Sequence, residues 1–215
     1  MSQKETIVLS VGGSLIVPGE IATDFLTKLH TFITHQTTNH GRFFIIIPGG
    51  GKTSRNYVSA LKSYTDDHTA HDRLGIAACA MNGALLEELF KDNENVLVRP
   101  DPELYEPGAS SDRAAVRTAI KHDAKKAINL SNISHVYTAD PNTDPAATKI
   151  DKITWADFRK LIPGEFTPNL SSPFDPEAAK LAEENAIEVA TIHGDSLNEV
   201  ENYLAGNEFD GTVIS

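Results

Sequence analysis

The sequence has little cysteine and no long apolar run, and each shortage excludes a class of protein. Cys79 is the only cysteine in 215 residues, so no disulfide can form within the chain. No apolar stretch approaches the roughly 20 residues of a membrane-spanning helix, and residues 1–5 show no secretory signal. We therefore expect a cytoplasmic protein with no disulfide framework and no membrane partner.

The sequence is also short of basic residues. It has 19 Lys and Arg against 30 Asp and Glu, which gives a formal net charge of −11. Nucleic-acid binding usually leaves a basic surface, so we expect no nucleic-acid partner. The same acidic field repels anionic substrates. A phosphate site would therefore depend on backbone amides, helix N-termini and a few local cations.

Apolar runs that predict strands alternate with segments that have helical spacing. The predicted strands are 7–11, 43–47, 96–98, 126–130, 187–192 and 212–214. The predicted helices are 21–35, 53 onward, 69–91, 113–122, 155–158, 176 onward and 196–204. The run 43–47 is apolar throughout, which is typical of a parallel strand covered on both faces. This order predicts an α/β fold, a three-layer αβα sandwich with a mostly parallel central sheet.

Glycine-rich turns follow the first two predicted strands. Gly12-Gly13-Ser14 ends the first strand, and Gly49-Gly50-Gly51-Lys52 ends the second. Glycine lets the backbone approach a phosphate closely, and a helix that follows adds its dipole. Lys52 and Arg55 could supply positive charge, although the spacing is not that of a Walker A loop. The alternatives are a tight turn without a ligand at Gly12 and a surface loop with a solvated lysine at Lys52.

A third candidate for ligand binding is Pro107-Gly108-Ala109-Ser110-Ser111-Asp112, which precedes a predicted helix. Its hydroxyls and the helix N-terminus suit an anion or a sugar hydroxyl, and plain N-capping by Ser111 or Asp112 is the alternative. His68 and His71 could suggest a metal site, but no second cluster supports one, so a solvated helix start is favoured. We therefore expect no metal ion held by protein side chains.

One further segment is specific enough to indicate a family. Val136-Tyr137-Thr138-Ala139-Asp140-Pro141 is followed by the pair Lys149-Ile150, and residues 175–180 read Asp-Pro-Glu-Ala-Ala-Lys. Together with the two glycine turns, these segments resemble the amino acid kinase family, most closely its archaeal-type uridylate (UMP) kinases. The resemblance covers nearly the whole chain.

The resemblance implies an ATP-dependent phosphotransferase of pyrimidine biosynthesis, which transfers the γ-phosphate of ATP to UMP to give UDP, with Mg²⁺. It implies one domain over residues 1–215, with an acceptor lobe at about 1–125 and an ATP lobe at about 126–215. It also implies a homo-oligomer, either a dimer or a hexamer. Phosphoryl transfer depends mainly on positioning and charge stabilisation, which suits opposed phosphate cradles.

The resemblance also assigns residues to the two substrates. The residues at the ATP phosphates would be Gly13, Ser14, Gly50 and Arg55. Those around the adenine and ribose of ATP would be Ser131, Tyr137 and Asp140. Those that contact UMP would be Gly49, Asp72, Tyr105, Pro107, Gly108, Ala109, Ser110 and Ser111.

The chain departs from the family pattern at three places. Ser10 stands where many members have a lysine that contacts the transferred phosphate, so Lys52 and Arg55 are the candidate catalytic cations. Ser134-His135 replaces an Asp-Gly pair before the ATP loop, and residues 102–106 replace a Gly-Gly-Thr segment before the acceptor loop. Two alternatives therefore stay open. One is a non-catalytic protein that binds a nucleotide or an oxyanion, similar to molybdate or tungstate storage proteins, and the other is a kinase of another small acceptor.

Overall fold

The computed structural model describes residues 4–99, 103, 105, 110–163 and 172–215 of the protein. Over these residues the strands are β1 (Thr6–Val11), β2 (Phe43–Pro48), β3 (Val96–Val98), β4 (Lys126–Ser131), β5 (Val136–Tyr137), β6 (Lys149–Ile150), β7 (Lys152–Ile153), β8 (Glu188–His193) and β9 (Gly211–Ile214). The helices are α1 (Gly13–Ile16), α2 (Thr23–Asn39), α3 (Gly51–Leu61), α4 (His68–Phe90), α5 (Ser111–Lys121), α6 (Trp155–Leu161), α7 (Pro176–Glu184) and α8 (Leu197–Ala205).

The described strands form one large sheet and one hairpin. The sheet has seven strands in the order β3-β2-β1-β4-β8-β9-β7, and β5 pairs with β6 in the hairpin. The first five strands of that order are parallel, whereas β9 runs antiparallel to β8. The carboxyl ends of β1, β2 and β4 therefore meet at one edge of the sheet, where ligands bind in folds of this kind.

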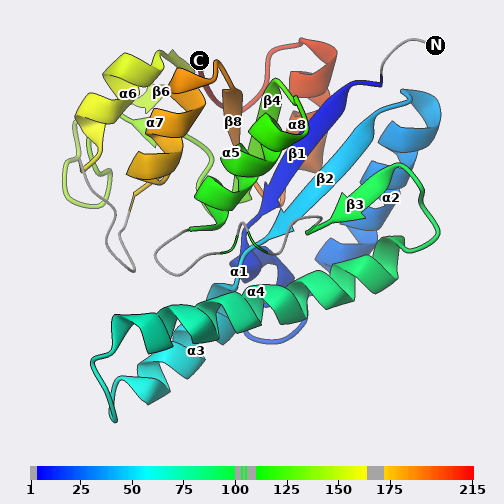
Figure 1. The fold of residues 1–215 in the computed structure, drawn as a ribbon. Helices are drawn as coiled ribbons and strands as arrows, with labels where there is room; N and C mark the ends of the chain where they lie inside the picture. The colour runs from blue at the N-terminus through cyan, green and yellow to red at the C-terminus, as the bar shows by residue number, and fades with distance from the viewer. Residues whose placement is uncertain (1–3, 100–102, 104, 106–109, 164–171) are drawn as a thin grey trace.

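Alternate residues of the strands face two separate apolar cores. In β1, Ile7, Leu9 and Val11 pack into one core and Val8 into the other. The first core is completed mainly by α2 and α8, and the second by α5, α6 and α7 on the opposite face (Figure 1). The continuous apolar run of β2 is needed because both of its faces are covered.

Helices α3 and α4 pack against each other at the carboxyl edge of the sheet, and α4 crosses that edge as a long rod (Figure 1). The Asp67 carboxylate accepts a hydrogen bond from the Thr69 amide and caps α4. His71 is buried, and its Nε2 lies 3.0 Å from the Thr65 carbonyl. The expectation of a solvated helix start is therefore wrong at His71, whose buried ring contacts the turn between α3 and α4.

The expected αβα sandwich is confirmed, and each predicted strand and helix is present with shifts of a few residues at its ends. The additional elements are α1, β5, β6 and β7, which have two to four residues each. They are too short for hydrophobic periodicity to reveal them. Among the described helices, none combines the length and the hydropathy that a bilayer span requires.

Candidate active site

The two glycine turns lie in direct contact at the carboxyl edge of the sheet. The Gly12 amide donates to the Leu130 carbonyl, and the Gly49 amide donates to the Val11 carbonyl, so both turns are fixed to neighbouring strands. A Cβ atom on Gly13 would collide with the nitrogen of Gly51 and the carbonyl of Gly49. The structure therefore brings the two turns into contact, and only glycine fits at position 13.

The second turn leads directly into α3. Gly51 has a φ of 58°, a left-handed conformation that glycine adopts without strain, and it is the first residue of the helix. Gly50 is the residue before it, with a helical conformation and no capping side chain. The first amides of α3 are therefore left open at the junction of the turns, as an anion site requires.

Two cations of α3 lie beside this junction. The Arg55 Nη2 donates to the Ser14 hydroxyl at 3.0 Å, which links α3 to α1 across the two turns. The Lys52 side chain is exposed, and its Nζ lies 3.9 Å from the place that a Cβ on Gly19 would take. Over the described part of the chain Lys52 makes no ion pair. Its ammonium is thus free to turn toward a bound phosphate.

Helix α4 forms the wall of the site on the side of the second turn. The buried Asn82 donates from its Nδ2 to the Gly49 carbonyl at 2.7 Å, which holds this turn in place. Asp72 is half-buried near the start of the same helix and has interaction partners of its own. No sequence pattern indicates Asn82, because an amide within an Ala- and Leu-rich helix belongs to no motif.

The third candidate turn is described only in part, since Pro107, Gly108 and Ala109 lie outside the described residues. The Ser110 hydroxyl accepts a hydrogen bond from the Arg113 amide and caps α5. The Ser111 hydroxyl lies 3.6 Å from the place of a Cβ on Gly49, so this turn borders the second glycine turn. The N-cap is therefore Ser110, one residue before the expected Ser111 and two before Asp112.

Arg99 and Tyr105 add two buried polar atoms near this turn. Arg99 follows β3 with a φ of 44°, and its side chain lies so close over Gly83 of α4 that a Cβ there would collide with it. Its Nη2 donates to Glu87 at 3.1 Å, but its buried Nε and the buried Tyr105 hydroxyl have no hydrogen-bond partner among the described residues. Burial raises the pKa of Tyr105, so the hydroxyl stays protonated. Buried polar atoms without partners are rare, and a ligand is one explanation for them.

A pair of carboxyl groups stands where the N-termini of α5 and α7 meet. The Asp112 Oδ2 accepts a hydrogen bond from the Asp175 amide at 3.2 Å. The Asp175 Oδ1 caps α7 through the amides of Glu177 and Ala178, and within the described part of the chain its buried Oδ2 has no partner. Burial, reinforced by the Asp175 carboxylate, raises the pKa of Asp112 to about 7. From the sequence, Asp112 is a candidate helix cap and Asp175 precedes a predicted helix, and no pattern links the two residues.

The raised pKa of Asp112 predicts that the protein loses stability as the pH rises. The pKa of Asp112 rises from 3.8 to about 7 on folding, so folding favours the protonated form. The stabilisation is complete below about pH 4 and is lost as the pH rises through 7. Asp112→Asn should therefore gain stability over the wild type by about 2 kcal/mol or more between pH 4 and 8. Denaturant unfolding of both proteins across this range measures the difference.

The exposed Asp92 provides the matched control. The Asp92→Asn variant removes a surface carboxylate and should keep the free energy of unfolding within about 0.5 kcal/mol of the wild type. A difference between wild type and Asp112→Asn that stays constant with pH would contradict the raised pKa of Asp112.

The residues expected to surround the adenosine of ATP lie at the end of β4 and in the β5–β6 hairpin. The Ser131 carbonyl accepts a hydrogen bond of 2.8 Å from the Gly194 amide, which joins the ends of β4 and β8. Tyr137 lies in β5 with a half-buried side chain. The Asp140 Oδ1 accepts hydrogen bonds from the amide and the side chain of Asn142, which stiffens the loop of the hairpin.

His135 has a structural place beneath this hairpin. Its side chain is buried, with Nδ1 3.1 Å from the Ser134 hydroxyl and Nε2 3.7 Å from Asp210. Lys149 of β6 pairs with the same Asp210 at 3.1 Å. Burial and the nearby Lys149 lower the pKa of His135, so the ring is neutral at physiological pH. The Ser134-His135 pair thus belongs to a packed network that anchors the hairpin to β9.

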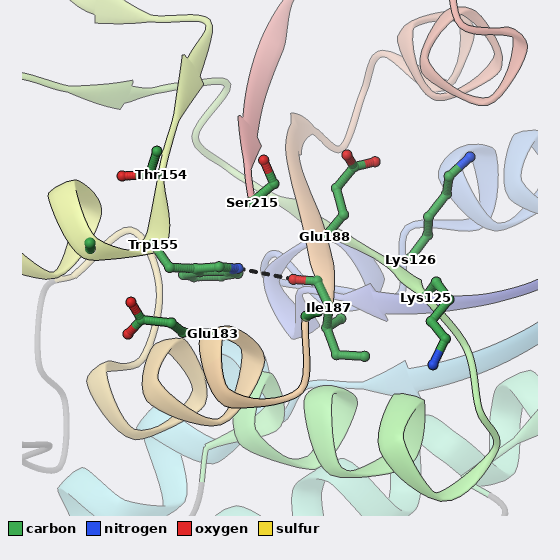
Figure 2. A pocket seen from close by; sticks show the side chains of 10 residues that line it. Lys125, Lys126, Thr154, Trp155, Glu183, Ile187, Glu188 and Ser215 are labelled. Carbon is green, nitrogen blue, oxygen red and sulfur yellow. Dashed lines mark hydrogen bonds between the residues drawn. The ribbon is translucent and has the colours of Figure 1, made fainter.

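A separate pocket of about 520 Å³ lies at the opposite, amino edge of the sheet (Figure 2). Its floor is Trp155, whose Nε1 donates to the Ile187 carbonyl. Three charged groups on its rim are in ion pairs, Lys125 with Asp123, Lys126 with Glu5, and Glu183 with Arg159. A fourth, Glu188, accepts a hydrogen bond from the Tyr203 hydroxyl. These interactions occupy the charged side chains of the rim, whereas the first amides of α3 at the glycine turns are open.

Comparisons with known proteins agree with this geometry. The sequence profile described as "Amino acid kinase family" matches residues 85–192, half of the chain. The uridylate kinase of Hyperthermus butylicus is 24% identical, over 99% of each chain. The uridylate kinase of Thermoplasma volcanium is 29% identical, over 94% of each chain.

Solved structures extend the similarity to three dimensions. The uridylate kinase from Archaeoglobus fulgidus has a TM-score of 0.78 at 25% identity, over 97% of this chain and 99% of that chain. The UMP kinase from Bacillus anthracis has a TM-score of 0.81 at 16% identity, over 98% and 96%, which shows the shared fold alone. The chain belongs to the amino acid kinase family, and the expectation that it is a phosphotransferase is confirmed.

Proposed function

We propose that this protein is a nucleoside monophosphate kinase that transfers the γ-phosphoryl group of ATP to UMP and releases ADP and UDP. The observation that carries the proposal is the direct contact between the two glycine turns, with open amides and two cations beside it. Relatives that match along almost the whole chain and are named uridylate kinases support the same acceptor.

The transfer step needs charge stabilisation more than a covalent nucleophile. A phosphate oxygen of UMP attacks the γ-phosphorus, and the bond from that phosphorus to the β–γ bridging oxygen breaks, so ADP leaves. Gly13, Ser14 and Gly50 would hold the ATP phosphates, with Arg55 bound to the Ser14 hydroxyl as one cation. Lys52 would turn inward as the second cation. It would take the role of the lysine that many family members have at the position of Ser10.

The acceptor would lie between the second turn, α4 and the loop before α5. Gly49, fixed by Asn82, would contact UMP, and Asp72 would bind the ribose. The buried Nε of Arg99 and the Tyr105 hydroxyl would find partners in the carbonyl groups of the base. Pro107, Gly108, Ala109, Ser110 and Ser111 would complete this side of the site.

The adenosine of ATP would lie between the end of β4 and the β5–β6 hairpin, beside Ser131, Tyr137 and Asp140. Mg²⁺ would arrive as part of the ATP complex, because this ion keeps phosphate oxygens and waters as most of its ligands. The division into an acceptor lobe at about 1–125 and an ATP lobe at about 126–215 follows from this arrangement.

The assembly and location of the protein stay predictions. A dimer or hexamer would cover α3, which buries none of its residues within the chain, and the exposed Tyr57 and Met81 on α3 and α4. A cytoplasmic location would suit the single free Cys79.

An acceptor panel tests the proposal. ADP release is coupled to a dehydrogenase and measured with Mg²⁺–ATP and each of UMP, CMP, AMP, GMP and small carboxylates. We expect kcat/KM for UMP to exceed that for any other acceptor by at least about tenfold. Turnover with a carboxylate but not with UMP would assign a different acceptor. Tight ATP or molybdate binding without any turnover would instead indicate a non-catalytic binding protein.

A further inference from the structure

Two histidines and a glutamate meet on the surface far from the glycine turns. His35 lies in the last turns of α2, His40 is the C-cap residue of that helix, and Glu201 lies on α8. One donor atom from each of the three lies within 4.8 Å of the donor atoms of the other two. No residue of this group belongs to the phosphotransferase site proposed above.

The distances are close to those of a metal site. The His35 Nδ1 is 3.9 Å from the Glu201 Oε1, and the two imidazole rings have centroids 5.5 Å apart. Ligands of a tetrahedral zinc ion stand about 3.3 Å from one another. All three side chains are exposed, so changes of rotamer can close the remaining gap without moving the backbone.

The surroundings favour a cation. The C-terminal end of α2 carries the negative end of its helix dipole, and His40 lies at that end. The nearby Arg42 is already committed, with its guanidinium bound to Glu5, the Gln36 side chain and the Leu204 carbonyl. The acidic net charge of −11 adds a long-range attraction for cations.

The position separates this cluster from catalysis. Helix α2 ends just before β2 begins at Phe43, so His35 and His40 lie at the amino edge of the sheet. The glycine turns lie at the carboxyl edge, and α2 and α8 both cover the face of the first core. A metal ion held here would join the end of α2 to α8.

We propose that His35, His40 and Glu201 form a binding site for a divalent transition-metal ion, with Zn²⁺ as the preferred ion, that ties α2 to α8. Two imidazoles and one carboxylate are a ligand set for zinc, whereas Mg²⁺ takes oxygen ligands. The fourth position of the tetrahedron stays open to water. This proposal departs from the expectation that the protein holds no metal ion through its side chains.

Tag-free protein without nucleotide is titrated with ZnCl₂ by calorimetry, and its thermal midpoint is measured with and without about 100 μM Zn²⁺. We expect one ion bound per chain and a rise in Tm of ~4 °C, because only the folded chain presents all three ligands. Mg²⁺ at the same concentration should leave Tm unchanged. The His35→Ala/His40→Ala double variant and the Glu201→Gln variant should lose most of the shift.

The matched control is His68→Ala, which removes an exposed histidine from another helix, α4. This variant should keep the full zinc shift, and the double variant should keep its phosphotransferase activity. The proposal would be overturned if zinc raised the Tm of the double variant as much as that of the wild type. It would also be overturned if the wild type bound no zinc in the calorimetric titration. Loss of the shift in His68→Ala alone would place the zinc on α4 and overturn it as well.

Discussion

Gly13→Ala is expected to lower kcat/KM at least hundredfold, because the added methyl group has no room between the two glycine turns. Its Cβ would collide with Gly51 and Gly49, and both obstacles are backbone atoms that cannot rotate away. The turns would have to separate, which would move the open amides of α3 away from the phosphates. A displacement of about 1 Å in a positioned site costs on the order of a hundredfold in rate. Steady-state kinetics with Mg²⁺–ATP and UMP measures this loss.

Gly19→Ala is the matched control for this variant. Gly19 lies in the loop after α1, and the nearest atom to its Cβ would be the Lys52 Nζ at 3.9 Å, an ordinary contact with a flexible side chain. Circular dichroism and thermal unfolding show whether both variants keep the fold. A folded Gly13→Ala protein with the wild-type rate would refute the contact between the turns as the phosphate site.

Lys52→Ala is expected to lower kcat more than tenfold with little loss of stability. Lys52 is exposed and unpaired in the described part of the chain, so its removal leaves no buried group without a partner. Because position 10 is a serine, the first turn has no cation of its own. Lys52 and Arg55, both on the helix that follows the second turn, are the two cations beside the site. Loss of a charge that stabilises the transition state lowers kcat rather than raising KM alone.

Lys62→Ala removes an exposed lysine just beyond the other end of the same helix and serves as the control. It should leave kcat within about twofold of the wild type, as most changes to surface charge do. Lys52→Arg should recover part of the rate, since it restores the charge with a different shape. An unchanged kcat in Lys52→Ala would remove Lys52 from the mechanism and leave Arg55 as the cation.

The main elements of the fold could be predicted because its long segments have clear periodicity. The strand 43–47 is apolar at every position, and the structure covers both of its faces. The sequence places a glycine turn after each of the first two strands, but the contact of Gly13 with Gly49 and Gly51 was not predicted, because it depends on the direct pairing of β1 with β2. Segments of two or four residues, such as β5 and α1, are fixed by tertiary contacts instead and have no pattern to read.

The parts of the site that sequence analysis missed depend on long-range partners. Asp112 and Asp175 are 63 residues apart in the sequence, and each has a sufficient local explanation at the start of its own helix. Arg99 has no motif, and its unusual backbone angle and unpaired Nε are visible only in three dimensions. His35, His40 and Glu201 likewise meet only when α2 and α8 pack on the same face of the sheet.

Transfer of a labelled phosphate tests the central claim most directly. The protein is incubated with Mg²⁺, ATP labelled at the γ-phosphate and UMP, and the products are separated by chromatography. We predict that the label appears in UDP in step with the formation of ADP, and that Gly13→Ala abolishes both. Label that stays in ATP, or that is released only as inorganic phosphate while ATP binds at full stoichiometry, would contradict the assignment of these turns to phosphoryl transfer.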